Sequence, residues 1–303
     1  MSKLKTIFHL IRKPRKIIRI LGDKRFLNWL PDRTYLKLVY LSETGRILNL
    51  DNPQTYNEKL QWLKLYDRRP EYSIYADKYA VRSYIAETIG EQYLIPLLGV
   101  YNSVEEIDWG SLPDKFVLKC THGSGSNIIC SDKSKLNVEE AKKKLRKWMK
   151  HSWYWFGREW PYRNVIPRII CEQFIETDDG KAPIDYKVMC SNGEPKLIQV
   201  HIDRYGDTYT MDFYDINWEK TSICQGVPIS KKTLEKPKNF HLMLNFARML
   251  TKDMPYARID FYEQNEVLYF GEITLYPTSG FALFENDNHD VDLGSWIYLN
   301  TRK

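Results

Sequence analysis

The second half of the sequence contains two β-hairpin patterns, and they limit the fold to one built on antiparallel strands. The first pattern is centred on Asn192-Gly193, a dipeptide that favours tight hairpin turns because both residues tolerate a positive φ. The second is centred on Gln264-Asn265, and a helix is expected between the hairpins at 240–250. The expected strands cover residues 186–190, 196–203, 257–263 and 266–274.

The first half of the chain predicts helices that alternate with short strands. Thr55 or Asn57 can cap a first helix, and Asn137 can cap another over 138–149. A further helix is expected over 77–89. The expected strands cover 93–101, 115–120 and 169–175. Because there is no fixed-period repeat and no obvious flexible linker, the pattern predicts an α+β protein of closely packed lobes.

Positive charge is concentrated near the N-terminus. The formal net charge is +6, yet residues 1–25 hold nine basic residues against one acid, Asp23, so the rest of the chain is slightly acidic. This distribution argues against a nucleic-acid-binding surface. Apolar and basic residues share the segment 3–30 at mostly helical spacing. Such a segment can lie on an anionic membrane surface or pack as a surface helix on its own domain.

The cysteines and the apolar runs exclude several classes of protein. The five cysteines form no C-x-x-C pair, and four lie in or beside apolar, strand-like runs, so neither a disulfide framework nor structural zinc is expected. No apolar run reaches the roughly 18 residues of a transmembrane helix. The start of the sequence does not match a secretory signal. We therefore expect a cytoplasmic protein, and 43% apolar residues are enough for a substantial core.

A lysine at the end of an expected strand precedes a glycine-rich loop. Lys119 faces away from Leu118 and Cys120, because side chains alternate along a strand. The loop His122-Gly123-Ser124-Gly125-Ser126 offers flexible backbone N–H donors beside that cation. A phosphate site needs both features. Glycine-rich turns also occur as plain connections between strands, so both interpretations stay open at this point.

Acidic residues face each other across the second hairpin. Arg258 and Asp260 share one face of its first strand, and Glu272 and Thr274 share a face of its second. Two carboxylates on neighbouring strands can hold Mg²⁺, which prefers oxygen ligands. The arginine could stabilise phosphoryl charge. The alternative is a solvent-facing strand pair with an Arg–Asp surface ion pair.

Further polar residues lie between these two stretches. Glu172 follows an apolar run, and Asp185 and Lys187 share one face of the next strand. On the partner strand, His201 and Asp203 alternate with apolar residues. A polar face of this kind is either the wall of a cleft or a solvent-facing surface. For His201 and Asp203 we expect the solvent-facing surface.

In this order, these elements resemble the ATP-grasp superfamily, and more narrowly its TupA-like branch, over about residues 52–296. That branch is associated with teichuronopeptide and other bacterial surface-polysaccharide biosynthesis. The motifs that carry the resemblance are Tyr56-Asn-Glu-Lys-Leu-Gln-Trp62, Asp77-Lys78, Lys119-Cys-Thr-His-Gly-Ser-Gly125, Glu172, Asp185-Tyr-Lys187, Phe213-Tyr-Asp215, Arg258-x-Asp260 and Gly271-Glu-Ile-Thr274.

The resemblance implies an ATP-grasp fold in which two α+β lobes clamp ATP. We accordingly expect a basic helical arm over 1–50, a helical and αβ subdomain over 51–114, a small lobe with the glycine-rich loop over 115–180, and a large lobe with the metal site over 181–303. Lys78 and Lys119 would contact phosphates, and Glu172 the adenine amino group. The full set implied to bind ATP is Lys78, Lys119, His122, Gly123, Ser124, Gly125, Ser126, Glu172, Gln173, Ile175, Asp185 and Lys187.

The resemblance also implies a metal site and two catalytic groups. Asp260 and Glu272 would ligate Mg²⁺, and Arg258 with Lys119 would stabilise the transferring phosphoryl group. Many ATP-grasp enzymes have asparagine where this chain has Thr274. A hydroxyl is a weaker ligand than an amide carbonyl, so the sequence leaves open whether one or two Mg²⁺ ions bind.

The implied activity is ATP-dependent ligation of a carboxylate to an amine through an acyl phosphate. The substrates would be a carboxylate-bearing sugar or polysaccharide precursor and an amine such as an amino acid, with Ser279 and Gly280 bordering the acceptor site. Residues 1–25 would hold the enzyme at the inner face of the membrane. The alternatives are a glycosyltransferase, for which Asp290-Val-Asp292 is the available D-x-D motif, an ATP-grasp-type kinase, and a non-catalytic binding protein.

Overall fold

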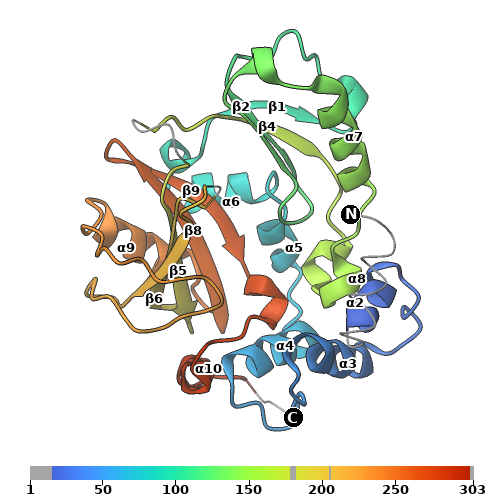
Figure 1. The fold of residues 1–303 in the computed structure, drawn as a ribbon, viewed down its shortest axis with the longest axis vertical. Helices are drawn as coiled ribbons and strands as arrows, with labels where there is room; N and C mark the ends of the chain where they lie inside the picture. Colours follow the sequence, from blue (N-terminus) through green and yellow to red (C-terminus); the bar gives the residue numbers. More distant parts are fainter. Residues whose placement is uncertain (1–15, 178–181, 205, 301–303) are drawn as a thin grey trace.

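Two antiparallel β-sheets form the framework of the molecule (Figure 1). The computed structural model describes residues 16–177, 182–204 and 206–300. The smaller sheet has the strand order β1-β4-β2-β3, and the larger has the order β7-β6-β5-β8-β9, which confirms the predicted α+β class. The strands are β1 Leu97–Tyr101, β2 Phe116–Cys120, β3 Asn127–Cys130, β4 Ile169–Gln173, β5 Asp185–Ser191, β6 Glu194–Ile202, β7 Thr210–Tyr214, β8 Tyr256–Gln264 and β9 Val267–Thr274.

The large sheet has one apolar and one polar face, because its side chains alternate along each strand. Val188 on β5 and Ile259 on β8 are paired and fully buried. They belong to the core that also contains α9, Phe240–Leu250, which packs against β5, β6 and β8. Their neighbours Lys187 and Asp260, also a pair in the register, project from the opposite face. Asp185, which shares this face, lines the same cavity as Lys119 of the small sheet, so the polar face is turned toward the small sheet.

The two predicted hairpins are present, with one shift in position. The turn between β5 and β6 falls at Asn192-Gly193, as predicted. The turn between β8 and β9 falls at Asn265-Glu266, one residue later than predicted. The reason is that Gln264 still pairs with Val267, so the strand continues through it. Asn265 and Glu266 both adopt a positive φ, at 51° and 64°.

The small sheet buries one face under α7, Val138–Met149, and leaves the other open. Phe116, Leu118 and Cys120 on β2 are fully buried and share a core with Ala141 and Leu145 of α7. Asn137 caps α7 by accepting a hydrogen bond from Glu140 N at 3.0 Å, as predicted. Since β2 alternates, the side chain of Lys119 projects from the uncovered face. The edge strand β1 pairs with β4 and so belongs to the small sheet. It lies before residue 115, where the small lobe was expected to begin.

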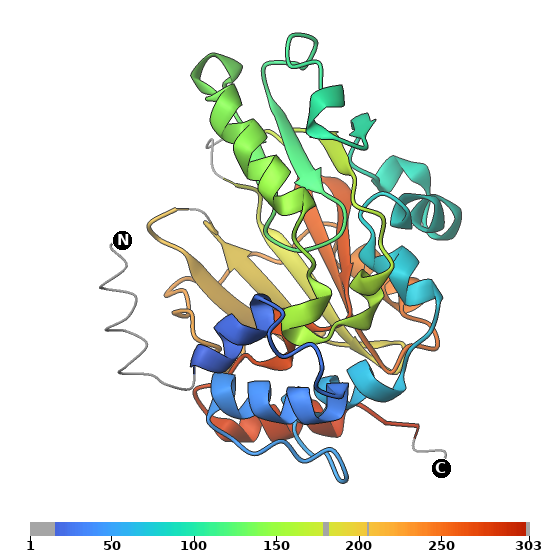
Figure 2. The ribbon, with the colours of Figure 1, turned by 90° about the vertical axis from the view of Figure 1, so that its right-hand side faces the viewer.

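The remaining helices connect the sheets and form the base of the molecule (Figure 2). Thr55 caps α4 in a reciprocal capping box with Glu58, so the first of the two predicted caps is used. Across the described residues, no helix combines the length and the apolar composition needed to cross a membrane. These elements are α2 Lys16–Asp23, α3 Asp32–Thr44, α4 Tyr56–Tyr66, α5 Glu71–Ala76, α6 Val81–Thr88, α8 Tyr154–Gly157 and α10 Asp287–Ser295, with the 3₁₀ turns η1 Glu91–Tyr93, η2 Val104–Glu106, η3 Lys133–Lys135, η4 Trp160–Arg163 and η5 Pro277–Gly280.

The N-terminal arm lies partly outside the described residues, which begin at residue 16. Its later part packs on the body of the molecule: α2 contacts α3 and α8. In α3, Tyr35, Leu36 and Val39 are fully buried in a separate core that also contains Phe281. This second half of the expected arm is therefore part of the globular fold.

Candidate nucleotide and metal site

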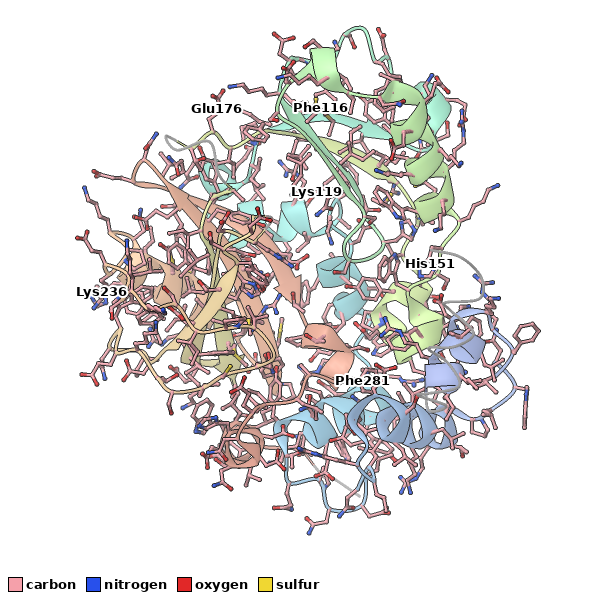
Figure 3. All side chains as sticks on the ribbon, viewed as in Figure 1. Phe116, Lys119, His151, Glu176, Lys236 and Phe281 are labelled. Atoms are coloured by element: carbon pink, nitrogen blue, oxygen red, sulfur yellow. The ribbon has the colours of Figure 1, made fainter. Side chains whose placement is uncertain are left out.

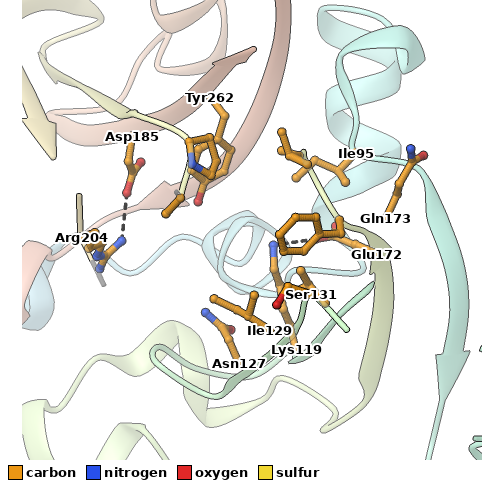
Figure 4. Close-up of a pocket in the computed structure, with 15 residues that line it drawn as sticks. Ile95, Lys119, Asn127, Ile129, Ser131, Glu172, Gln173, Asp185, Arg204 and Tyr262 are labelled. Carbon is orange, nitrogen blue, oxygen red and sulfur yellow. Dashed lines mark hydrogen bonds and ion pairs between the residues drawn. The ribbon is translucent and has the colours of Figure 1, made fainter. Parts of the chain in front are cut away.

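A cavity of about 420 Å³ lies between the two sheets (Figure 4). Lys119 and Val117 of the small sheet line one side, and Asp185 and Tyr262 of the large sheet line the other. Five of the residues expected to bind ATP line this cavity, namely Lys119, Glu172, Gln173, Ile175 and Asp185. The other lining residues are Ile95, Asn127, Ile129, Ser131, Phe174, Ala182, Pro183 and Arg204. Mainly apolar walls with a few polar groups are typical of a small-ligand site.

Glu172 is the charged centre of the small-sheet side. Its carboxylate lies 2.6 Å from the amine of Lys119 and 3.2 Å from the guanidinium of Arg82. Lys119 and Glu172 come from neighbouring strands, β2 and β4, and their side chains meet on the open face of the sheet. Arg82 belongs to α6 and was not predicted. Nothing in the sequence marks it, because a single arginine on an amphipathic helix usually faces solvent.

On the large-sheet side, two cations hold Asp185. Its carboxylate lies 2.6 Å from the amine of Lys187 and 2.9 Å from Arg204. The amine of Lys187 also contacts Asp260 on the neighbouring strand, and both of these side chains are almost fully buried. Arg204 was not predicted, although its place directly after the polar face of β6 could have indicated it. The face therefore carries a continuous row of alternating charges.

The expected metal strand continues this row. Arg258 makes two contacts with the carboxylate of Asp260, at 2.7 and 2.8 Å, and donates to Thr274 Oγ1 at 3.2 Å. Asp260 and Glu272 are direct partners in the β8–β9 register. Burial alone would raise the pKa of Glu272, but Lys78, together with Lys187 and Arg258, holds the pKa well below its usual value. These cations therefore favour the ionised form of Glu272.

Lys78 connects the metal strand with the glycine-rich loop. Its amine lies 3.2 Å from Glu272 Oε2 and donates to Gly123 O at 2.7 Å. Its backbone N–H donates to Thr121 O at 3.1 Å. The cation is thus fixed between the glycine-rich loop and the expected metal strand. Figure 3 places Lys119 in the same region, between the sheets.

Only the tip of the glycine-rich loop is open to solvent. Ser124 and Gly125 are exposed, whereas Gly123 and Ser126 are buried. A side chain at Gly123 would meet the indole of Trp153 at 1.9 Å, so glycine is needed there for close packing. His122 faces away from the tip, with Nε2 3.2 Å from Trp148 O, and burial lowers the pKa of its imidazole. Ser124 and Gly125 are therefore the part of the loop that a ligand can reach.

The prediction that His201 faces solvent was wrong. His201 is only 8% exposed, and its ring stacks on Tyr209 and lies 2.7 Å from the Tyr209 hydroxyl. Burial lowers the pKa of His201 to about 2, and the nearby cations Lys187 and Arg204 contribute. The alternation in β6 was correct, but the ring of Tyr209 stacks on His201 and helps to bury it. Asp203 is partly buried.

The D-x-D motif lies on α10 and takes part in helix capping. Asp290 is 1% exposed, and it accepts hydrogen bonds at 3.0 Å from both the backbone N–H and the side-chain amide of Asn57, at the start of α4. Arg46 is also nearby, at 3.7 Å. Asp292, the other carboxylate of the motif, is exposed. Asp290 therefore has a structural partner for its charge.

The oxygen atoms at the β8–β9 pair fit Mg²⁺. The carboxylates of Asp260 and Glu272 face the same side of the sheet, and Thr274 Oγ1 lies 3.4 Å from Glu272 Oε1. The side-chain cations Lys78, Lys187 and Arg258 contact these carboxylates, so the oxygens lie where positive charge is bound. Within the described ranges, no group of three or more His, Cys, Asp or Glu side chains is suited to hold a metal. A Mg²⁺ here would take its remaining ligands from water and phosphate, as is usual for this ion.

The comparisons with known proteins identify one matching family and several similar solved structures. A sequence model described as TupA-like ATPgrasp matches residues 58–298. A search of curated proteins finds no match. A solved D-alanine–D-alanine ligase from Bacillus anthracis in complex with ATP is 14% identical over 74% of this chain, with a TM-score of 0.41, and the chain covers 63% of that ligase, less than two thirds.

Two further solved structures are similar to the same degree. A D-cycloserine synthetase is 13% identical over 76% of this chain and 72% of its own, with a TM-score of 0.42. An L-amino acid ligase from Bacillus licheniformis is 14% identical over 74% of this chain and 47% of its own, with a TM-score of 0.41.

Proposed function

This chain belongs to the TupA-like ATPgrasp family, and on that premise we propose that it is an ATP-dependent carboxylate–amine ligase of bacterial surface-polysaccharide biosynthesis. The observation that carries the proposal is the position of Lys78. Its amine contacts Gly123 O in the glycine-rich loop and Glu272 Oε2 on the expected metal strand. Both stretches thus meet at one cation, as the binding of a single triphosphate requires.

The residues of the cavity suit a nucleotide. Ile95, Phe174 and Ile129 offer apolar contacts to a base, and Glu172, which lines the same cavity, can accept hydrogen bonds. Asp185, on the opposite side, is placed to accept hydrogen bonds from ribose hydroxyls. A base in this cavity would direct its phosphates toward the charged row on the large sheet.

The charged row is suited to bind phosphate and a metal together. Three carboxylates, those of Asp185, Asp260 and Glu272, contact four cations. The cations are Lys78, Lys187, Arg204 and Arg258. Mg²⁺ held by Asp260 and Glu272 would supply positive charge to phosphate oxygens. Arg258, which is fixed by two contacts to Asp260, would keep its guanidinium ready for charge that develops on the phosphoryl group.

The proposed reaction has two steps. A substrate carboxylate oxygen bonds to the γ-phosphorus of ATP as the bond to the β–γ bridging oxygen breaks, which gives an acyl phosphate and ADP. An amine nitrogen then bonds to the acyl carbon, inorganic phosphate leaves, and the amine releases a proton. The protein contributes position and charge, and no covalent nucleophile is required.

The test is ADP release by purified full-length protein with ATP, Mg²⁺, uronic acids and amino acids in combination. We expect release that depends on both a carboxylate and an amine, and an amide product by mass spectrometry. Asp260→Asn should abolish the release, and Asp292→Asn, which changes an exposed carboxylate, should not. Glu272→Gln replaces Asp260→Asn if the latter does not fold, since Glu272 is about a third exposed.

Other outcomes identify the alternatives. Consumption of a nucleotide sugar without ATP would show a glycosyltransferase. A stable phosphorylated product that forms without an amine would show a kinase. Either result would overturn the ligase proposal.

We also propose that the N-terminal region contacts an anionic membrane. Lys24 and Arg25 are exposed, and two aromatic side chains follow them, Phe26 at 65% and Trp29 at 77% exposed. Leu27 and Leu30 of the same turn pack against the core of α3. The turn is therefore anchored on one side and presents aromatic and basic groups on the other, a combination that suits the membrane interface.

A further inference from the structure

One face of α4 carries a buried row of polar side chains. Asn57, Gln61 and Lys64 follow one another at helical spacing, and each is 0% exposed. Buried amide and ammonium groups are costly unless they have hydrogen-bond partners. Three such groups on one helix therefore indicate that the helix binds a particular set of hydrogen-bond acceptors.

The partners are backbone carbonyls of the segment that follows β9. Gln61 Nε2 donates to Ser279 O at 3.0 Å and to Gly280 O at 2.7 Å. Lys64 Nζ donates to Ser279 O at 2.8 Å and to Ser279 Oγ at 3.0 Å. Asn57 Nδ2 donates to Ala282 O at 2.8 Å. The helix thus binds three carbonyls of one short segment.

The segment has an unusual backbone conformation. Thr278, Ser279 and Gly280 have φ values of 50°, 54° and 63°, so three consecutive residues are left-handed. Two of them are not glycine, and such conformations persist only when the surroundings enforce them. A side chain at Gly280 would also meet Gln61 Nε2 at 2.5 Å. We name this segment, Thr278–Gly280, the left-handed turn.

The left-handed turn follows β9, the strand that carries the proposed metal ligand Glu272. Three residues separate the turn from Thr274, whose hydroxyl oxygen accepts a hydrogen bond from Arg258. Burial raises the pKa of the Tyr162 hydroxyl on η4, and the charges of Glu159, Glu272 and Arg258 also act on it, so these three side chains lie near this ring. Glu159 in turn contacts Ser279. Figure 3 shows Phe281, the next residue, near α4.

We propose that Lys64 and Gln61 are positioning residues, which hold the left-handed turn in place so that it borders the carboxylate substrate at a fixed distance from Glu272. A trans peptide directs its carbonyl and its N–H to opposite sides. Because α4 binds the carbonyl of Ser279, the N–H of Gly280 points away from α4. This inference rests on the proposed ligase function for the nature of the substrate, but not for the conformation of the turn.

The first experiment measures amide hydrogen exchange in the full-length protein. Lys64→Met should raise exchange in the segment 276–283 at least tenfold. Lys59→Met is the matched control, since Lys59 also lies on α4 and donates to backbone carbonyls, but to those of Gly294 and Ile297. It should leave 276–283 unchanged. The inference is overturned if the amides of 276–283 exchange at the same rate in Lys64→Met as in the unmodified protein.

The second experiment separates positioning from general stability. With the acceptor found by ADP release, Lys64→Met should raise the KM for the carboxylate at least tenfold and change the KM for ATP less than twofold. An equal rise in both constants would show a merely structural role. If Lys64→Met does not fold, Gln61→Leu tests the same carbonyls without a change of charge. If no acceptor is found, the ligase proposal fails, while the exchange experiment still decides whether α4 holds the turn.

Discussion

Lys78 Nζ lies 3.2 Å from Glu272 Oε2, and this ion pair joins the segment before the small sheet to the last strand of the large sheet. The two sheets have separate hydrophobic cores, so neither depends on this contact to form. The amine also donates to Gly123 O. The pair therefore fixes the glycine-rich loop relative to the acidic strand, which is the geometry that a bound triphosphate would need.

Lys78→Met is expected to lower kcat/KM for ATP by roughly 30- to 1,000-fold, since a lysine on a phosphoryl group contributes about 2–4 kcal/mol to the transition state. Initial rates of ADP release measure the effect. Lys115→Met is the control, because the ion pair of Lys115 with Glu176 is exposed and such pairs contribute about 1 kcal/mol or less. Equal rates for the two variants would contradict the prediction.

Asp260→Asn is expected to lower the free energy of unfolding by about 3–5 kcal/mol, because it leaves the buried cations Arg258 and Lys187 without their shared counter-charge. Urea unfolding measures this change. Asp287→Asn serves for comparison: that carboxylate pairs with Arg46 but is 69% exposed, and a loss below about 1 kcal/mol is expected. An unfolding curve for Asp260→Asn that overlays the unmodified one would disprove the claim.

The sequence predicted most strands of the two sheets because their signals are local, whereas β3 and β7 were not predicted. The alternation in β2 placed Lys119 on the opposite face from Leu118, and that face is the open one. The pairing of Asp260 with Glu272 followed from one hairpin, although the turn lies one residue later than expected. Such patterns depend on side chains a few residues apart, which is the range over which a single sequence is informative.

The contacts between distant segments could not be predicted in this way. Arg82 reaches Glu172 across 90 positions, and on its helix it has the spacing of a solvent-exposed residue. Lys64 is similar: a lysine on an amphipathic helix is usually exposed, yet this one is 0% exposed because its partners come from beyond β9. His201 was assigned to solvent for a related reason, since the ring that stacks on it belongs to Tyr209, which lies beyond the end of β6.

If the N-terminal region contacts a membrane, binding to anionic vesicles should depend on Phe26 and Trp29. The double variant Phe26→Ser, Trp29→Ser should reduce binding to vesicles that contain 30% phosphatidylglycerol by about tenfold or more, as burial of each aromatic side chain is worth about 1.5–3 kcal/mol when complete. Co-sedimentation measures the bound fraction. Ile166→Ser, a change at another exposed apolar residue, should have no effect. Removal of residues 1–25 should also weaken binding, and unchanged binding in both cases would refute membrane contact.

The buried amine of Lys64 predicts a specific dependence of stability on pH. Burial lowers the pKa of Lys64 to about 7, although Glu159 partly opposes this shift. In the unfolded chain the amine keeps its proton up to about pH 10.4. Between these values the unfolded state binds more protons than the folded state, so the free energy of unfolding should rise as the pH increases from 7 to 10, by at most about 1.4 kcal/mol per pH unit. Below pH 7 both states hold the proton, and this contribution becomes constant.

Urea unfolding of the protein and of Lys64→Met at pH 6, 7, 8, 9 and 10 tests this dependence. The difference in the free energy of unfolding between the two should grow in favour of the unmodified protein across the upper part of the range. Lys144→Met, which removes a lysine that is 54% exposed on α7, should follow the unmodified protein at each pH. A constant difference between the protein and Lys64→Met from pH 7 to 10 would mean that Lys64 keeps its proton in the fold, and that its contact with Ser279 is a charged one throughout.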